Sequence, residues 1–498
     1  MPRNRLDTQA VVVGAGPVGL MLAGELRLGG ADVVVLEQRD APTTESRAST
    51  LHARTMEILD SRGLLPAFGT PPNEPRGHFG GIPLDLTLPS PYPGQWKVPQ
   101  FRTEEALQEW ALSLGADIRR GHELRGVSVP AADGEYVEAE AVGPDGPLLL
   151  RARYLVACDG EDSAVRRLTG AAFPGQDAGR ELLRADVDGI EIPNRRFERL
   201  AGGLAIAARR DDGVTRVMVH EFGSTAAART GAPEFAEIAD VWKRVTGEDI
   251  GAGTPLWVNS FGDADRQLVR YRDGRVLYAG DAAHRQMPIG GQALNLGLQD
   301  AFNLGWKLAL HLRGAAPAAL LDTYHQERHT VGRRVLANIT AQASLLLGGA
   351  EVEPTRAVLA ELMASEAVRA HLAAMISGLD VRYAVDGPPH PLLGARLPHT
   401  LLASGDVPNP LARALRAGRG VLIDPRRGTD TVPRVGDGWA DRVSAVAAPA
   451  APGVPAAPGS APEGLDGVLV RPDGHVAWAG PGSDGLPEAL ERWFGPPL

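Results

Sequence analysis

Residues 10–37 read AVVVGAGPVGLMLAGELRLGGADVVVLE, and they give the clearest indication of the fold class. It opens with a β-branched run at 10–13, which suits a strand buried on both faces. A glycine-rich turn follows at 14–19, and then a segment with helical spacing that ends at two glycines. A second β-branched run fills 32–36, with Glu37 at its carboxyl end. The order strand, turn, helix, strand predicts a βαβ unit in an α/β protein.

The turn itself has the spacing GxGxxG, formed by Gly14, Gly16 and Gly19. In such a turn the first glycine permits the sharp bend, the second lets the backbone approach a pyrophosphate, and the third lets the helix pack against the strand. Free amides and the helix dipole attract the phosphates. Glu37 can accept hydrogen bonds from a ribose diol, and its charge would repel a 2′-phosphate. The unit therefore predicts a Rossmann-like dinucleotide site, and leaves FAD and NAD open.

Composition bounds the remaining possibilities. The 498 residues suggest about three domains, and 44% apolar and 22% charged residues are typical of a globular chain. A net charge of -10 and a pI near 5.7 argue against nucleic acid as the main partner. Cys158 is the only cysteine, which excludes an intrachain disulfide and a CxxC site and favours a reducing, cytoplasmic location.

Two local patterns are misleading. Thr8 to Gly24 has no charged residue and follows a basic start, as in a signal peptide, but Pro17 and the glycines would break its helix. No other stretch is long and apolar enough to span a bilayer, so no membrane partner is expected. His325 and His329 have the i, i+4 spacing of metal ligands, but no third ligand follows nearby. We expect no metal.

Two more predicted strands end in acidic residues. Residues 154–158 read YLVAC and lead into Asp159, and residues 275–279 read RVLYA and lead through a glycine into Asp281. A long helical stretch follows from about Gln292 to Arg313. Ligands of open α/β sheets bind beyond the carboxyl ends of strands. Acidic strand ends more than a hundred residues apart therefore predict one cofactor-binding sheet interrupted by an inserted domain.

These segments carry a family resemblance. GAGPVG with Glu37, CDGEDSAVR at 158–166 and GDAAHRQMPIGGQALNLGLQDAFNLGWKLA at 280–309 resemble the three FAD motifs of the group A flavin monooxygenases, the p-hydroxybenzoate hydroxylase-like family. Nearly the whole chain is similar to actinobacterial hydroxylases that tailor aromatic polyketides (angucyclines, anthracyclines and tetracyclines) and to the related rifampicin monooxygenase. Two departures stand out: Ala293 replaces the last glycine of GGQG, and Gln286 stands where relatives often have a second histidine.

The resemblance implies a set of FAD contacts beyond the glycines, and it places Ala293 against the flavin. The expected contacts are Val18, Glu37, Gln38, Arg47, Gln100, Leu124, Asp159, Asp281, Leu294 and Asn295. The candidates for contact with substrate are His52, on a helix expected over Ala48 to Gly63, together with His78 and Pro288. No residue is assigned a catalytic role, because acid-base residues in this family vary with the substrate.

The resemblance also implies a domain plan. We expect a FAD-binding domain in two parts, 1–172 and 271–391, the second including a helical region. A substrate-binding mixed sheet is expected over 173–270. A thioredoxin-like domain is expected over 392–498, with strands at 420–424 and 467–471 flanking a Pro/Ala-rich loop from 447 to 464. Without a CxxC this last domain has no redox role, and packing or a homodimer contact is the expected one.

The implied activity is hydroxylation of a polycyclic aromatic polyketide in antibiotic biosynthesis. NADPH, or NADH, reduces FAD, and O2 then forms a flavin C4a-hydroperoxide that the substrate attacks. The chain has a single GxGxxG unit in strand context, so the nicotinamide donor visits transiently. Two alternatives stay open: a Baeyer-Villiger oxygenation of a polyketide ketone, and a flavin-bearing binding protein that does not oxygenate.

Overall fold

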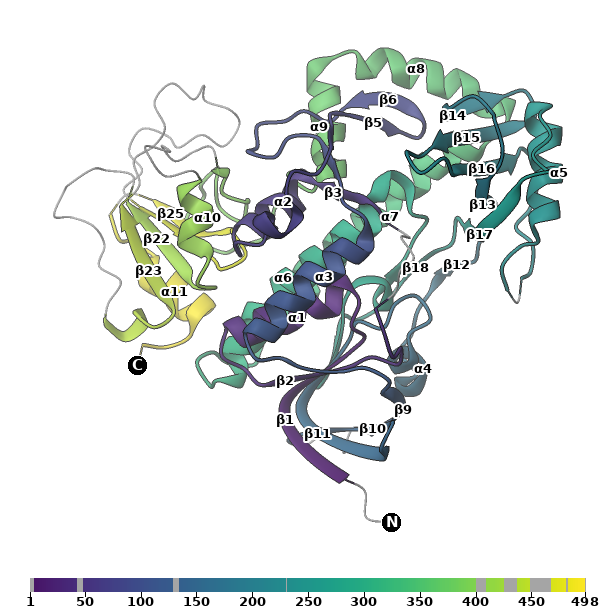
Figure 1. The fold of residues 1–498 in the computed structure, drawn as a ribbon. Helices are drawn as coiled ribbons and strands as arrows, with labels where there is room; N and C mark the ends of the chain where they lie inside the picture. Colours follow the sequence, from purple (N-terminus) through teal and green to yellow (C-terminus); the bar gives the residue numbers. More distant parts are fainter. Residues whose placement is uncertain are drawn as a thin grey trace.

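The structure is a computed structural model that describes residues 4–42, 48–128, 134–229, 231–399, 409–424, 437–447, 467–480 and 482–497. Its elements form three main sheets, seen in Figure 1 at the bottom, the upper right and the left. The predicted Pro/Ala-rich loop falls almost entirely outside the described residues.

The largest sheet has eight strands and is built on the opening βαβ unit. Its main path runs β19-β20-β11-β1-β2-β8, and an antiparallel pair, β10 and β9, extends from β11. The bounds are β1 (Asn4–Val13), β2 (Val33–Leu36), β8 (Asp117–Arg119), β9 (Glu123–Ser128), β10 (Val137–Gly143), β11 (Gly146–Ala157), β19 (Arg272–Asp273) and β20 (Val276–Tyr278). Strands β2, β1, β11 and β20 are parallel and buried, as their Val/Leu-rich runs predict.

Helices pack on this sheet and complete the main core. Helix α1 (Pro17–Leu28) packs against α3 (Gln100–Ser113) and α6 (Gln292–Leu312) (Figure 1). The short α4 (Ala164–Thr169) is capped by Ser163, whose hydroxyl accepts a hydrogen bond from the Arg166 amide. The apolar side chains of these helices and of the parallel strands form one cluster.

The second sheet has five strands in the order β14-β15-β16-β13-β17. Their bounds are β13 (Glu181–Asp188), β14 (Arg195–Leu200), β15 (Gly203–Arg209), β16 (Thr215–Glu221) and β17 (Thr254–Gly262). All its pairs are antiparallel, in contrast to the mixed sheet expected from the sequence, because hairpins join β14 to β15 and β15 to β16. Helix α5 (Phe235–Thr246) covers one face through an apolar cluster, which leaves the other face for the site described below.

Short sheets and long helices connect these two parts. The small strands are β3 (Thr50–His52), β4 (Asn73–Glu74), β5 (Arg76–Phe79), β6 (Ile82–Asp85), β7 (Gln95–Lys97), β12 (Gly175–Gln176), β18 (Asp265–Gln267) and β21 (His284–Arg285). The helices are α2 (Ala53–Asp60), α7 (Ala319–Leu347), α8 (Glu353–Met363) and α9 (Glu366–Ser377). Among the described residues no single helix has both the length and the apolar character to cross a membrane. The bent pair Ala319–Leu347 and Ala350–Met363 meets both criteria when taken together.

The third sheet lies in the C-terminal part, in the order β23-β22-β24-β25. Its elements are α10 (Pro410–Leu415), β22 (Gly420–Asp424), β23 (Val443–Ala447), β24 (Gly467–Val470), β25 (Val476–Gly480) and α11 (Leu486–Phe494). Trp478, Trp493 and Phe494 share one buried cluster with Trp306 of α6 and Leu320 of α7. The C-terminal sheet is therefore packed directly onto the helices of the first part.

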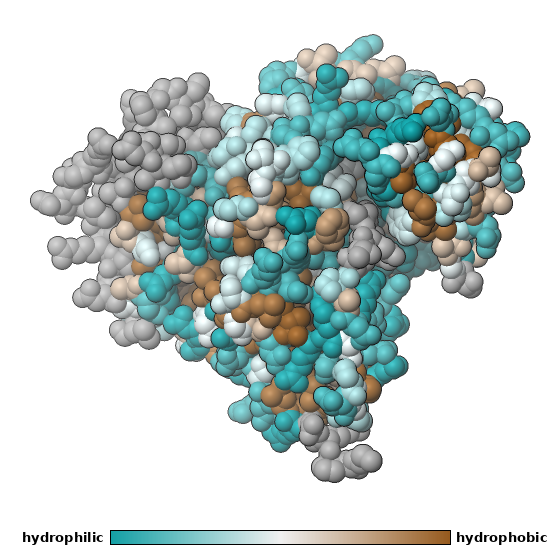
Figure 2. All heavy atoms as spheres, in the orientation of Figure 1, coloured by the Kyte–Doolittle hydropathy of each residue, from teal (hydrophilic) through white to brown (hydrophobic). Residues whose placement is uncertain are grey.

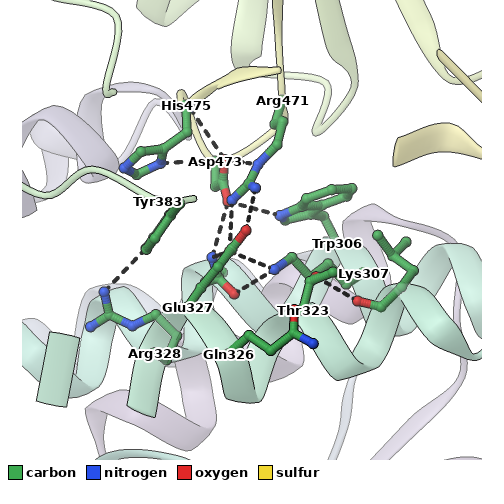
Figure 3. Close-up of polar contacts among 12 residues, drawn as sticks. Trp306, Lys307, Thr323, Gln326, Glu327, Arg328, Tyr383, Arg471, Asp473 and His475 are labelled. Atoms are coloured by element: carbon green, nitrogen blue, oxygen red, sulfur yellow. Dashed lines mark hydrogen bonds and ion pairs between the residues drawn. The ribbon is translucent and has the colours of Figure 1, made fainter. Parts of the chain in front are cut away.

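A buried ion cluster strengthens this contact (Figure 3). Arg471, just after β24, donates to both carboxylate oxygens of Glu327 on α7, at 2.6 and 3.0 Å. Lys307 of α6 donates to the same carboxylate at 2.7 Å, and Trp306 donates to Asp473 at 3.2 Å. These side chains are almost wholly excluded from solvent. Figure 2 shows the surface of one face of the molecule, where hydrophilic residues separate the hydrophobic ones into groups.

Candidate flavin and substrate site

The carboxyl ends of four parallel strands meet at one edge of the large sheet. In the register, Val13 lies beside Leu36 and Ala157, and Ala157 lies beside Tyr278. The residues that follow these strands line a single cavity of about 970 Å³. They include all three predicted corners, the glycine turn with Glu37, Asp159 and Asp281.

The glycine turn has the geometry that its spacing predicts. Gly14 has φ +102°, and a Cβ there would collide with the backbone carbonyl of Cys158. A Cβ at Gly19 would collide with the Gly14 carbonyl oxygen, so the helix lies directly on the turn. A Cβ at Gly16 would meet no atom within 4 Å, although Gly16 lines the cavity. Gly16 also caps α1 without a side-chain hydrogen bond, which leaves a cradle of backbone at a helix N-terminus.

Glu37 is tied to this turn. Its Oε2 accepts a hydrogen bond from the Ala15 amide at 2.8 Å, and its Oε1 accepts one from the Arg39 amide at 2.9 Å. Each carboxylate oxygen has a further lone pair. Glu37 therefore holds the turn in place and can still accept from a ligand hydroxyl, the role predicted for it.

Asp159 provides a test of whether a ligand fits here. Its Oδ2 accepts from the Val165 amide at 3.0 Å, while its Oδ1 is buried and has no hydrogen-bond partner within the described parts of the chain. Burial raises the pKa of this carboxyl group. Buried polar atoms are nearly always paired, so an orphan at a cavity wall suits a ligand with a hydrogen-bond donor. FAD, with its ribose and ribityl hydroxyls, is such a ligand.

Most of the predicted cofactor residues border this one cavity. Those on its wall are Gly14, Gly16, Val18, Glu37, Gln38, Gln100, Leu124, Asp159, Asp281, Ala293 and Leu294, together with the substrate candidate Pro288. Gly19 lies behind the turn, Asn295 is buried next to the cavity wall, and Arg47 is outside the described residues. The described residues contain no group of three or more His, Cys, Asp or Glu placed to bind a metal ion.

Asn295 and His52 brace the turn that precedes α6. The Asn295 side chain donates to the carbonyl oxygens of Thr50 and Gly291, at 2.9 and 2.7 Å, and accepts from the His52 amide at 2.9 Å. The His52 ring donates from Nε2 to the Gly290 carbonyl at 2.7 Å, and burial lowers its pKa to about 4. His52 lies off the cavity wall, so its contacts are with the backbone of this turn.

The helix expected over Ala48 to Gly63 needs correction. Residues 50–52 form β3, which pairs with β7, and α2 begins only at Ala53. His52 thus ends a strand, where its backbone amide is free to reach Asn295.

The other histidine candidate, His78, is also buried and lies off the cavity wall. Its ring centroid lies 3.9 Å from that of Phe197, and its Nδ1 accepts from the Gly81 amide at 3.1 Å. Burial lowers its pKa to about 4. Its surroundings are those of a packed core side chain.

The departure at Ala293 is accommodated without backbone strain. Ala293 lies in the first turn of α6, and the only non-glycine residues with positive φ in the described chain are Phe197 and Asn409. The methyl group therefore sits on ordinary helical backbone at the cavity wall.

Sequence reasoning missed Asp300, which anchors the loop carrying Asp281. Its Oδ2 accepts from the Gly280 amide at 3.1 Å and contacts His284 Nε2 at 2.8 Å, and its Oδ1 accepts from Arg328 at 2.7 Å. Burial alone would raise the pKa of Asp300, but Arg328 and His284 hold it below its usual range. The sequence does contain a signal for Asp300, because it is an acidic residue within an otherwise largely apolar helical stretch.

The far end of the cavity is formed by the five-stranded sheet. Arg184 of β13 and Asn259 and Phe261 of β17 line this end, together with Gln286 and Pro288. The sheet strands carry no motif, so the sequence assigned none of their residues to the site. The cavity thus joins a glycine-and-acid end to an end with Phe261 and several polar side chains.

The chain belongs to the FAD-binding aromatic-ring hydroxylases. Residues 7–339 match the family model described as a FAD binding domain, and residues 390–497 match the one described as the C-terminal part of aromatic-ring hydroxylases. The expected family is therefore confirmed, and with it an α/β FAD-binding monooxygenase fold.

Named relatives are similar over nearly the full length. The chain is 42% identical to a 12-dehydrotetracycline 5-monooxygenase/anhydrotetracycline 6-monooxygenase of Streptomyces rimosus, over 98% of this chain and 99% of the relative. It is 41% identical to a rifampicin monooxygenase of Streptomyces venezuelae, over 97% and 98%. Among solved structures it resembles CabE, an aromatic hydroxylase from angucycline biosynthesis, with 50% identity, a TM-score of 0.92 and coverage of 99% and 100%.

Proposed function

We propose that this flavin monooxygenase hydroxylates a polycyclic aromatic polyketide in antibiotic biosynthesis, with O2 and NADPH, or NADH, as co-substrates. The observation that carries the proposal is the single cavity, which has a dinucleotide cradle at one end and a sheet face with Phe261 and polar side chains at the other. Its volume of about 970 Å³ is large for a binding site. This substrate class is supported by relatives named as monooxygenases of 12-dehydrotetracycline, anhydrotetracycline and rifampicin, and by an aromatic hydroxylase from angucycline biosynthesis.

Each end of the cavity has a separate task in this proposal. The Gly16 backbone and the start of α1 hold the pyrophosphate, Glu37 holds a ribose, and Asp159 and Asp281 hold hydroxyl groups of FAD. The first turn of α6, with Ala293 and Leu294, lies against the flavin ring. Val18, Gln38, Arg47, Gln100, Leu124 and Asn295 complete the proposed contacts. Pro288 remains the substrate candidate on the cavity wall.

Bound FAD supplies the redox chemistry, accepting a hydride from the nicotinamide donor and activating O2. The protein positions the substrate and excludes water from the site. The aromatic carbon must be held within about 3 to 3.5 Å of the reacting oxygen, and water must be kept out. Because the sequence holds a single GxGxxG unit in strand context, the proposed donor binds only transiently.

The proposal extends to the organisation of the chain. The four segments 1–172, 173–270, 271–391 and 392–498 serve as its domain plan. A thioredoxin-like assignment for the last is supported by its strand order, in which the first two strands are parallel and the next two antiparallel, followed by a helix. A homodimer, a cytoplasmic location and the absence of nucleic-acid and membrane partners stay predictions.

Aerobic turnover tests the activity. Purified yellow protein is offered a panel of tetracyclic and angucyclic phenols, and NADPH consumption is compared with the structure of the product. We expect substrate-stimulated NADPH oxidation coupled to a new hydroxyl group on an aromatic carbon. An ester or lactone product would favour the Baeyer-Villiger alternative, and a bound ligand with no oxygenated product would favour a binding protein. Protein that stays colourless after incubation with FAD would contradict the flavin assignment.

A further inference from the structure

A second, smaller cavity, the helix pocket, borders the same turn of α6 as the large cavity of about 970 Å³. It has a volume of about 100 Å³ and lies between α6, α7, the end of α9 and the loop at 378–382. Its lining residues on α6 have the spacing of one helical face: Gln292, Asn295, Leu296 and Gln299. Ala293 and Leu294 line the large cavity instead, and no described residue lines both.

A chain of side-chain amides ends at the helix pocket with an unused donor. The Gly80 backbone amide is a donor, and Gln342 Oε1 accepts from it at 3.2 Å. Gln342 Nε2 therefore donates to Asn338 Oδ1, at 3.0 Å, and Asn338 Nδ2 donates to Gln292 Oε1, at 3.5 Å. Each amide thus fixes the orientation of the next one. The group left at the end of the chain is Nε2 of Gln292, which can only donate.

Gln292 Nε2 is a buried donor without an acceptor. The residue is only 3% exposed, and this atom has no hydrogen-bond partner within the described residues. In the same part of the chain, no other buried side-chain nitrogen or oxygen of the pocket lining lacks a partner. A buried N–H group that stays unpaired costs about 1–3 kcal/mol. A ligand oxygen that accepts from Gln292 is therefore favoured in the helix pocket.

The rest of the wall restricts the chemistry of that ligand. Apolar atoms make up the larger part of the surface of the helix pocket. Arg334 and Arg382, on its lining, are exposed, and Arg334 pairs with Asp380, so their charges lie toward solvent. A buried water needs two to four polar partners, which an apolar wall with one unused donor does not offer. The wall therefore favours an uncharged organic molecule over water or an ion.

The volume restricts the size of the ligand. About 100 Å³ is roughly a tenth of the large cavity, too little for FAD or for a polycyclic ring system. An apolar cavity of about 150 Å³ holds one benzene molecule. The helix pocket therefore suits a molecule no larger than a single ring.

We propose that the helix pocket is an effector site for a small, neutral carbonyl compound such as a ketone, an ester or an amide. The carbonyl oxygen accepts from Gln292 Nε2, and the carbon skeleton packs on the aliphatic side chains that line the pocket. The ligand also touches the turn of α6 that the proposed function places against the flavin ring, so the flavin senses whether the pocket is occupied. Only this link to the flavin rests on the proposed function.

Two matched probes test the site in the FAD-loaded protein. Cyclopentanone carries the acceptor oxygen and cyclopentane has the same ring without it, and the dissociation constant of each is measured by saturation-transfer NMR. We expect cyclopentanone to bind at one site in the wild type. Gln292→Leu should weaken its binding about fivefold or more, because the carbonyl loses its donor, while cyclopentane binds at least as tightly as before.

Two tryptophan variants show where the probes bind. Val331→Trp fills the helix pocket from α7 and should abolish binding of both probes, so it tests the site even if Gln292→Leu does not fold. Val358→Trp adds the same side chain on α8, at a position that is 58% exposed and outside the pocket lining, and should bind both probes as the wild type does. Binding that persists in Val331→Trp would place the probes elsewhere and overturn the site.

The absorption spectrum of bound FAD tests the link to the flavin. Cyclopentanone should change this spectrum with the dissociation constant found by NMR, and should not change it in Val331→Trp. Binding in the helix pocket without a spectral change would overturn the effector role. Equal cyclopentanone affinity in the wild type and Gln292→Leu would overturn the assignment of Gln292 as the donor. A protein that passes these tests but forms no oxygenated product would contradict the proposed hydroxylation and leave the helix pocket intact.

Discussion

At the scale of single residues, the glycines of the first turn divide by what a methyl group would meet. Gly14 and Gly19 face backbone atoms of their own fold, whereas Gly16 faces the open cavity. The fold itself therefore requires glycine at positions 14 and 19. At position 16, glycine is required only by the ligand that binds there.

This difference predicts opposite effects for two matched substitutions. Gly19→Ala forces a methyl group onto the Gly14 carbonyl and should cost about 3 kcal/mol in the free energy of unfolding. Gly16→Ala, at φ −76°, should change the stability of the apoprotein by less than about 1 kcal/mol. It should weaken FAD binding about tenfold or more, because the methyl group occupies the pyrophosphate cradle.

Thermal unfolding of the apoproteins and quenching of flavin fluorescence measure the two effects. An apoprotein of Gly16→Ala as unstable as that of Gly19→Ala would contradict the assignment. So would a Gly16→Ala protein that binds FAD with unchanged affinity.

At the scale of elements, α6 and α7 are joined to the strand end at Arg471 by the buried carboxylate of Glu327 (Figure 3). Arg471 and Lys307 both bind this carboxylate, but they differ in the number of hydrogen bonds they make to it. Arg471 forms two hydrogen bonds to Glu327, while Lys307 forms one, and burial lowers the pKa of Lys307 to about 8. Arg471 is thus the main partner.

We expect Glu327→Gln to destabilise the protein by about 3–5 kcal/mol, because it removes the hydrogen-bonded anion of the buried Lys307 and leaves Arg471 with Asp473 as its remaining carboxylate partner. Lys307→Met should cost much less, since the Arg471 pair remains and a methionine fills the same space. Urea unfolding of the two variants, side by side with the wild type, provides the comparison. Similar losses in both would show that Lys307 is as necessary as Glu327.

The lowered pKa of Lys307 predicts that the free energy of unfolding depends on pH. The folded-state pKa of Lys307 lies near 8, below its ordinary 10.5, so between these values the unfolded chain binds more protons than the folded one. The contribution of Lys307 to the free energy of unfolding therefore rises with pH, by at most about 1.4 kcal/mol per pH unit. The stability difference between wild type and Lys307→Met should grow between about pH 8 and pH 10. A difference that is flat or shrinks with pH would contradict the lowered pKa.

At the scale of the whole molecule, the C-terminal sheet shares its core with the FAD-binding part. Trp478, Trp493 and Phe494 pack in one cluster with Trp306 and Leu320, and the loop at 471–473 is bound between α6 and α7. Parts that share one apolar core in this way do not open independently.

We therefore expect a single cooperative unfolding transition for the full chain. Tryptophan fluorescence and far-ultraviolet circular dichroism should give coincident denaturant curves. FAD, whose proposed cavity has no residue of the C-terminal sheet on its wall, should shift both curves equally by mass action. A separate transition that FAD leaves unmoved would show that the C-terminal part unfolds on its own.

Local patterns predicted the parts of this protein that depend on neighbours in the chain. The strand, turn, helix and strand of residues 10–37 and the acidic ends at Asp159 and Asp281 could be read directly, because buried parallel strands and tight turns have their own residue preferences. The helix start at Ala53 and the antiparallel five-stranded sheet could not, since pairing of β3 with β7 and the hairpins of the sheet override local propensity.

The family, the glycine turn and the acidic strand ends follow from the amino-acid order alone, since each depends on residues close along the chain. Folding was needed to show that Arg184 and Asn259 line the same cavity, that Asp300 holds the Gly280 loop, and that His52 supports a turn and lies off the cavity wall. The physical reason is that these contacts join segments many residues apart, and their geometry exists only once the three sheets and their helices have packed.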